Sequence, residues 1–143
     1  MIQRIQSIFL LLASVATFGF FGADAADTPA PVPASELFAD GSYSLLDDPV
    51  LIGLFALAGA LFLADIFLFR NRKLQVTLSR VALLLLVIGL AYGGYRWYAD
   101  SAAASAEPDF GLILPLVSLV FGVLAGRYIL KDEKLVRSAD RLR

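Results

Sequence analysis

Residues 50–69 read VLIGLFALAGALFLADIFLF, and this stretch decides the fold. Asp65 is its only charged residue. At about 1.5 Å per residue, a helix of this length crosses a hydrocarbon layer of about 30 Å. Lipid offers backbone amides no hydrogen-bond partner, so such a segment must be helical. The sequence therefore predicts a transmembrane helix over residues 50–69.

Three further apolar stretches of similar length flank this one, at residues 5–23, 81–98 and 110–130. The chain of 143 residues is 59% hydrophobic and 17% charged, whereas soluble domains are about 45–50% apolar and about 25% charged. A chain this short cannot bury so much apolar surface in its own core. We therefore predict an all-α integral membrane protein, one membrane domain over residues 1–143 with four transmembrane helices in an up-down bundle.

Basic residues gather on one side of this predicted membrane domain. The outer loop at residues 24–49 and the connection at residues 99–109 contain no Lys or Arg, and Arg96 is the only basic residue near them. By the positive-inside rule the other side is cytoplasmic. Both termini are thus predicted to be cytoplasmic, including an amphipathic tail at residues 131–143. The predicted cytoplasmic basic face consists of Arg70, Arg72, Lys73, Arg80, Lys131, Lys134, Arg137 and Arg141.

The first apolar stretch has a second interpretation. Arg4, the apolar run and Ala23-Asp24-Ala25 are also typical of a signal peptide with a cleavage site between small residues. Cleavage would leave three helices in the same orientation and an external N-terminus. We favour retention of the first helix, because the family resemblance described below includes residues that precede it.

Local signals mark the outer ends of the helices. Asp48-Pro49 and Glu107-Pro108 are predicted to open the second and fourth helices, because proline is tolerated at a first helical position and a carboxylate suits the helix N-terminus. The outer end of the third helix is rich in aromatic residues, which predicts an interfacial aromatic belt. The belt residues are Tyr92, Tyr95, Trp97 and Tyr98, and Arg96 among them is expected to reach outward to lipid head groups.

Asp65 is the sharpest single candidate, because ionisable residues inside a membrane span are functional-site hypotheses by default. It lies five residues before Arg70, within about 8 Å of the basic side along the helix axis. Arg127 of the fourth helix is predicted to lie at a similar depth. We therefore expect an intramembrane ion pair between Asp65 and Arg127, in preference to an ion or proton relay.

Small residues recur at four-residue spacing in three of the predicted helices. Such faces allow close approach of helix backbones in lipid. Packing within one chain is the expected role, and a homodimer or a seam with another membrane protein is the alternative, for which the fourth helix is the first choice. These predicted packing residues are Ala56, Ala60 and Ala64, then Gly89 and Gly93, then Ser118, Gly122 and Gly126.

Several kinds of chemistry find no support in the sequence. The chain contains no Cys and no His, which removes thiol nucleophiles and the commonest metal ligand. No phosphate-binding loop, nucleophile elbow or metal-ligand spacing is present. Basic residues without interleaved aromatics do not suggest nucleic-acid binding. We expect no catalytic, cofactor or metal site.

Three stretches together resemble one family. Residues 1–7 read MIQRIQS, residues 66–75 read IFLFRNRKLQ, and residues 131–143 read KDEKLVRSADRLR. In this order they resemble the bacterial small four-helix membrane proteins classed as domain of unknown function 4293. The resemblance extends over essentially the whole chain. It implies the four-helix fold and a bacterial membrane location, and it brings no catalytic residues.

The expected function follows from these features and from the absence of others. We expect a non-enzymatic protein of the bacterial inner membrane, a scaffold or accessory subunit whose partners are anionic lipids and a membrane protein or a second copy of itself. A small oligomeric transporter or channel is the alternative, although the spans lack the polar midplane groups that mark a pathway. An intramembrane enzyme is the least favoured class, although a fold alone does not exclude it.

Overall fold

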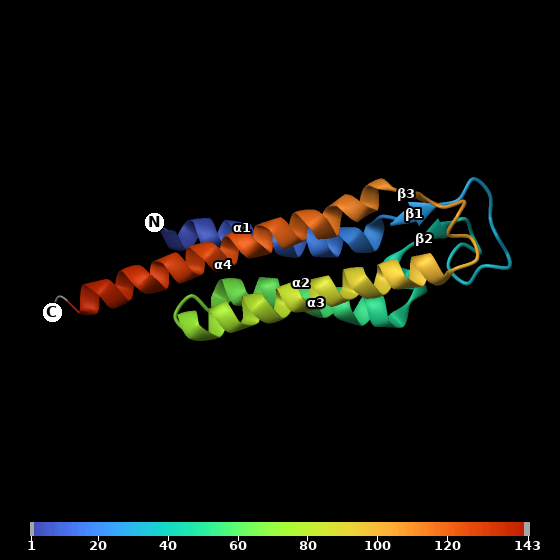
Figure 1. Ribbon diagram of the computed structural model, residues 1–143. Coiled ribbons are helices and arrows are strands. Elements are labelled where there is room, and N and C mark those ends of the chain that lie inside the picture. Colours follow the sequence, from blue (N-terminus) through green and yellow to red (C-terminus); the bar gives the residue numbers. More distant parts are fainter. Residues whose placement is uncertain (1, 142–143) are drawn as a thin grey trace.

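The computed structural model describes residues 2–141 and shows four long helices in an up-down bundle (Figure 1). These are α1 (Ile2–Gly19), α2 (Pro49–Phe67), α3 (Arg72–Ala99) and α4 (Ile113–Asp140). Each of these helices is long and apolar enough to cross a membrane. The span of α1 includes the 3-10 turn η1 (Phe20–Gly22) that follows it. The prediction of four helices of membrane-spanning length is therefore confirmed.

The helices form a ring in which each packs against two others. α1 contacts α2 and α4, and α3 contacts the same two helices from the opposite side. Large side chains fill the centre, among them Leu10, Phe55, Phe62 and Leu86. Many equally large apolar side chains point outward instead, as in a bundle surrounded by lipid rather than water.

The helix ends differ from the predicted ones mainly on the side of the α2–α3 turn. α3 begins at Arg72 rather than at residue 81, because the Asn71 side chain caps it by accepting a hydrogen bond from the Leu74 amide at 3.2 Å. α4 continues through the predicted tail as one helix of 28 residues. At about 1.5 Å per residue it is about 42 Å long, and its C-terminal part extends past the other helices (Figure 1). The last two residues of that tail, 142–143, lie outside the described residues.

The connections at the opposite end form a small antiparallel sheet that the all-α prediction did not include. It orders its three two-residue strands as β2 (Ser42–Tyr43), β1 (Ala26–Asp27) and β3 (Glu107–Pro108). The prediction that Glu107-Pro108 opens the fourth helix is therefore wrong. Pro108 lies in an edge strand, where its missing N–H costs no ladder hydrogen bond, and the helical chain begins only at the 3-10 turn η3 (Phe110–Leu112).

The outer loop folds down onto the bundle. Leu37, Phe38, Tyr43 and Leu45 are buried and join the core of the helices. The 3-10 turn η2 (Leu45–Asp47) then leads directly into α2. This loop layer closes one end of the bundle and positions the polar network described below.

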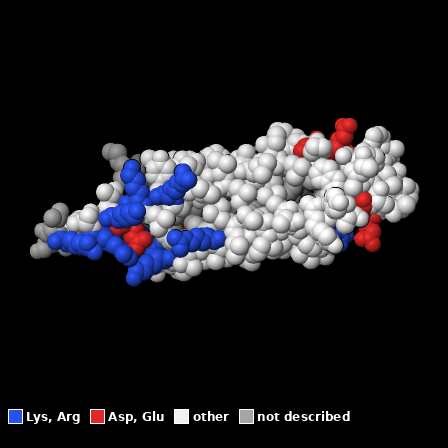
Figure 2. Space-filling model, in the orientation of Figure 1, with Lys and Arg blue, Asp and Glu red and all other residues white. Residues whose placement is uncertain are grey.

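Charge divides the molecule between its two ends. Figure 2 shows most of the visible Lys and Arg at the end where α4 projects and most of the visible Asp and Glu at the loop-covered end. We call the first the basic end, formed by the α2–α3 turn, both chain termini and the last turns of α4. We call the second the acidic end, formed by the loop layer and the helix ends beneath it.

Candidate functional site

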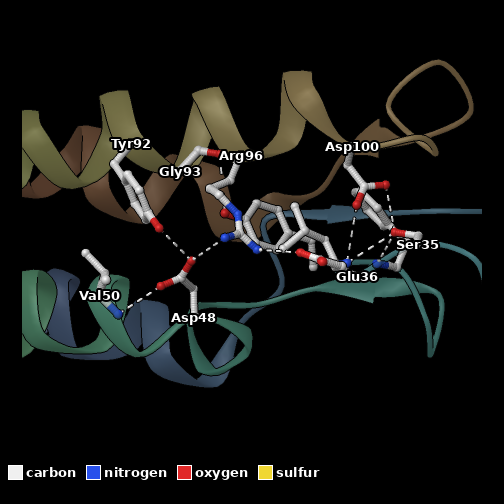
Figure 3. Close-up of polar contacts among 11 residues, drawn as sticks. Ser35, Glu36, Asp48, Val50, Tyr92, Gly93, Arg96 and Asp100 are labelled. Atoms are coloured by element: carbon white, nitrogen blue, oxygen red, sulfur yellow. Dashed lines mark hydrogen bonds and ion pairs between the residues drawn. The ribbon is translucent and has the colours of Figure 1, made fainter.

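The acidic end contains a polar network centred on Asp48. As predicted, Asp48 caps α2, since its Oδ1 accepts a hydrogen bond from the Val50 amide at 2.8 Å. Its other oxygen, Oδ2, accepts from the Tyr92 hydroxyl at 3.0 Å and lies 3.4 Å from Nη1 of Arg96 (Figure 3). The Asp48 side chain is only 4% exposed. This carboxylate therefore joins the start of α2 to the end of α3.

Arg96 lies at the centre of this network. Its Nη2 lies 3.4 Å from the Glu36 carboxylate of the outer loop, while Nη1 approaches Asp48 (Figure 3). The expectation that Arg96 reaches outward to lipid head groups stays a prediction, and the structure adds two carboxylates, those of Asp48 and Glu36, within ion-pairing distance of its guanidinium group. Arg96 was missed as a network residue, although it is the lone basic residue at an acidic end, and that was the available signal.

The predicted aromatic belt divides into two pairs. Tyr95 and Tyr98 are 67% and 85% exposed, in the outward positions that a belt requires. Tyr92 and Trp97 are partly buried, because Tyr92 bonds to Asp48 and Trp97 lines a cavity inside the bundle.

Asp100 attaches the outer loop to the end of α3. Its carboxylate accepts hydrogen bonds from the Ser35 hydroxyl at 2.7 Å, the Ala102 amide at 2.8 Å and the Leu37 amide at 3.4 Å. Partial burial opposes ionisation, but the hydrogen bonds outweigh it and hold the pKa of Asp100 below its usual value. Ser35 and Asp100 thus act with Arg96 to fix the loop layer.

The electrostatic potential at the acidic end is negative. Burial, and then the nearby charges of Asp27 and Asp109, raise the pKa of Asp24. Burial and the Asp48 carboxylate raise the pKa of Tyr43 to about 12. The Tyr43 hydroxyl donates to the Gly93 carbonyl at 3.3 Å, so it is buried with its partner at the same end.

Tyr43 should therefore titrate later than an ordinary tyrosine. Its raised pKa means that the folded chain holds this proton more tightly than the unfolded chain, so the associated stability is complete below pH about 10 and is lost as pH rises through about 12. In an ultraviolet titration of the five tyrosines, we expect one late step that Tyr43→Phe removes. A late step that persists in Tyr43→Phe would contradict the assignment.

A second polar cluster lies at the basic end, around the fully buried Asp65. The Ser79 hydroxyl of α3 donates to Oδ2 of Asp65, and Nε2 of the Gln75 side chain donates to the Asp65 backbone carbonyl at 3.1 Å. Gln6 of α1 donates to Oε1 of Gln75 at 3.4 Å, which brings a third helix into the cluster. Asp65 Oδ1 has no hydrogen-bond partner within residues 2–141.

The predicted ion pair between Asp65 and Arg127 is not formed. Arg127 is exposed on α4, whereas Asp65 points into the bundle toward α3, and α2 lies diagonally across the ring from α4. The intramembrane carboxyl is held by neutral donors instead. The sequence contained Gln75 and Ser79 at one-turn spacing, which could have indicated a polar partner face on α3.

Replacing Ser79 with alanine should destabilise the bundle. The variant leaves Asp65 Oδ2 buried without its donor, which costs about 1–3 kcal/mol. Ser138→Ala is the matched control, because its hydroxyl is exposed and bonds only to the preceding turn of α4. Thermal denaturation in detergent should separate the two variants, and equal melting temperatures would count against the cluster.

Hydroxyl groups inside the predicted spans form a third set, of which the sequence analysis named only Ser118, as a packing residue. Ser118 of α4 and Thr17 of α1 have hydroxyl oxygens 2.6 Å apart, and each oxygen lies 2.8 Å from the Ala13 carbonyl oxygen. One hydroxyl therefore donates to the other, which in turn donates to the carbonyl. Ser14 donates to the Gly59 carbonyl of α2 at 3.0 Å. These groups satisfy one another across helix seams, which is how polar residues join helices in lipid.

The predicted small-residue faces differ in their outcomes. Gly89 and Gly122 lie where two helices approach closely. A Cβ on Gly89 would lie 2.6 Å from the Phe55 ring, and one on Gly122 would lie 2.8 Å from the Leu83 side chain. Ser118 is buried, so this part of α4 packs within the chain and is not open for a dimer. Gly93 has ordinary contact distances, and nothing lies near Gly126. On α2 the expectation of packing within the chain is wrong, because Ala60 and Ala64 are exposed and Ala56 is only half-buried.

The basic face is placed at one end, as the charge pattern suggested. Arg72 is half-buried, where its Nε lies 2.9 Å from the Asp132 carboxylate of α4. Arg137 pairs with Glu133 one turn earlier at 2.8 Å. The remaining members are exposed, namely Arg70, Lys73, Arg80, Lys131, Lys134 and Arg141.

These clusters bind helices and loops to each other, and none has the arrangement of a metal centre. Within residues 2–141 no three His, Cys, Asp or Glu side chains lie close enough to hold a metal ion. Four helices that are long and apolar enough to cross a membrane, with polar clusters at both ends of the bundle, are typical of the class of small multi-helix membrane proteins.

The comparison with known families identifies one family. The chain matches the family described as domain of unknown function (DUF4293) over residues 2–142, and it belongs to that family. The resemblance drawn from the sequence is therefore confirmed. No curated protein matches the chain, and no solved structure matches it either.

Proposed function

We propose that this chain is a non-enzymatic protein of the bacterial inner membrane that serves as a scaffold or accessory subunit through its basic end. The positive-inside rule supports placing that end, with both termini, in the cytoplasm. It also supports contact between the exposed Lys and Arg side chains and anionic lipid head groups.

One observation carries the proposal, the projection of α4 beyond the bundle. On this projection Leu135 and Val136 are 48% and 37% exposed, between basic residues on the same helix. At the base of the projection, the Arg72 Nε lies 2.9 Å from the Asp132 carboxylate, so this ion pair links α4 to the start of α3. A rigid helix with apolar and basic side chains exposed outside the predicted span suits docking to a partner protein.

Retention of the first helix is part of this proposal. α1 supplies Leu10 and Ala13 to the core and Gln6 to the buried cluster with Asp65 and Gln75. Cleavage after Ala25 would expose all of these partners, and the family match includes the α1 residues. We expect the membrane-extracted protein to have an intact mass of 15.4 kDa, and a mass lower by the first helix would contradict retention.

The experiment is purification of the tagged chain in mild detergent after lysine crosslinking in membranes. We expect a stoichiometric partner protein linked through Lys73, Lys131 or Lys134, which are exposed at the basic end. A double variant, Leu135→Ser with Val136→Ser, should lose it. Leu46→Ser is the matched control, since Leu46 is 61% exposed at the acidic end. A chain that purifies alone would contradict the proposal.

The alternative, an oligomeric transporter or channel, has one observation in its favour. Asp65 is a buried intramembrane carboxyl that forms no ion pair within the described chain. Against it, the buried rings of Phe55 and Phe62 lie between Asp65 and Asp48 along α2. Ion flux in proteoliposomes that Asp65→Asn abolishes would favour the transporter, and no flux would leave the scaffold proposal standing.

A further inference from the structure

A cavity of about 250 Å³ lies inside the bundle at the acidic end, beneath the loop layer. Phe20, Leu51 and Phe55 form its inner walls, and Trp97 stands at the end of α3. Among residues 2–141, those that line it include no charged side chain. Apolar cavities of about 150 Å³ stay dry and bind small hydrocarbons, so this larger cavity is suited to an apolar guest.

Glycines of α3 create this space. Gly89, Gly93 and Gly94 line the cavity with backbone alone. A Cβ on Gly93 would meet Leu51 and the Tyr43 hydroxyl at an ordinary 3.5 Å, and one on Gly94 would meet nothing within 4 Å. The α3 wall is therefore open at Gly94 and loosely filled at Gly93, rather than closed by side chains.

The position of the exposed lining residues locates the opening. Leu90, Gly94 and Trp97 on α3 are partly or fully exposed, and so is Leu112 just before α4, whereas the inner lining is buried. The cavity thus opens between α3 and the start of α4. The α3 positions lie in the last turns of its apolar segment, where the aromatic belt is predicted, so we place the opening at the outer edge of the hydrocarbon layer.

We propose that this cavity binds one acyl chain of a membrane phospholipid with a zwitterionic head group. The bilayer supplies such chains at the opening, and the apolar walls match them. The carboxylates of Asp27, Asp47 and Asp109 are exposed at the same end and disfavour an anionic head group or a free fatty acid. The one basic residue nearby, Arg96, is already paired with Asp48 and Glu36.

Trp97 makes this proposal directly measurable, because it is the only tryptophan in the chain and lines the cavity. We expect phosphatidylcholine brominated on one acyl chain, titrated into the detergent-purified full chain, to quench Trp97 fluorescence. Quenching should have a saturable component with one site per chain, above the linear quenching by lipid in the micelle. Purely linear quenching would overturn the proposal.

Two variants assign the saturable component to the cavity. Gly93→Leu fills the cavity, and Gly94→Leu obstructs its opening. A Cβ on Gly94 would have no atom within 4 Å, so we expect Gly94→Leu to fold even if Gly93→Leu does not. Gly53→Leu is the matched control, on an exposed and equally empty position of α2. The saturable component should fall at least tenfold in affinity in Gly93→Leu or Gly94→Leu and remain in Gly53→Leu. Unchanged binding in both cavity variants would overturn the proposal.

Discussion

Gly111→Ala is expected to abolish or severely weaken folding. Gly111 lies in η3, where the start of α4 passes over the segment before β1. An added Cβ would overlap the Asp24 carbonyl oxygen and lie 2.8 Å from its carbonyl carbon. Both are backbone atoms, tied by the nearby hydrogen bond from the Asp109 amide to the Ala25 carbonyl at 2.9 Å. Overpacking usually lowers the free energy of unfolding by about 1–3 kcal/mol. Because backbone atoms cannot move aside as side chains do, we expect a loss of about 3 kcal/mol or more here.

Gly126→Ala is the control for that experiment. Gly126 lies on α4 with no heavy atom within 4 Å of its built Cβ, so alanine should change stability by less than about 1 kcal/mol. Folded yield and melting temperature in the same detergent provide the comparison. If the melting temperature of Gly111→Ala equals that of the wild type, the close approach of η3 to Asp24 is refuted.

Asp48→Ala has the second largest expected effect. The variant removes the N-cap of α2, worth about 1 kcal/mol. It also removes the nearly buried carboxylate that accepts from the Tyr92 hydroxyl and pairs with Arg96. The loss of these interactions adds about 1–3 kcal/mol. The combined loss should be about 2–4 kcal/mol, because one carboxylate serves both functions.

Asp48→Asn separates these two contributions. Asparagine caps helices about as well as aspartate, so it should restore the cap while losing the charge that Arg96 faces. We expect its stability to lie between that of the wild type and that of Asp48→Ala. Asp109→Ala is the matched control, because Asp109 is exposed and its side chain does not cap η3. Similar losses for Asp48→Ala and Asp109→Ala would contradict the network.

The helices were predictable from sequence because the bilayer imposes a length and a composition on each span. The apolar runs and the Asp48 cap placed α2 within two residues at each end. The start of α3 was not predictable from hydropathy, since its first turns contain Arg72, Lys73 and Arg80 and lie beyond the apolar run. Nor was the role of Glu107-Pro108, because a short strand and a helix start use the same residues.

The polar clusters were harder to predict because they depend on which helices are neighbours. The sequence predicts that Asp65 and Arg127 lie at a similar depth in the membrane. The order of the helices around the ring, however, places Ser79 and Gln75 next to Asp65. The same order turned Arg96 toward Asp48 and Glu36. Sequence spacing gives depth in the membrane, and only the packed bundle gives the angle around each helix.

The central claim is that the chain crosses the membrane four times with its basic end in the cytoplasm. The most direct test uses single-cysteine variants, which are clean because the chain has no cysteine. Ala30→Cys and Ser101→Cys place thiols on exposed positions of the acidic end, and Arg70→Cys and Ser138→Cys on exposed positions of the basic end. With a membrane-impermeant maleimide on intact spheroplasts, we expect the first two to label and the last two to label only after lysis. Labelling of Arg70→Cys or Ser138→Cys in intact cells, or protection of Ser101→Cys, would contradict the four-span topology.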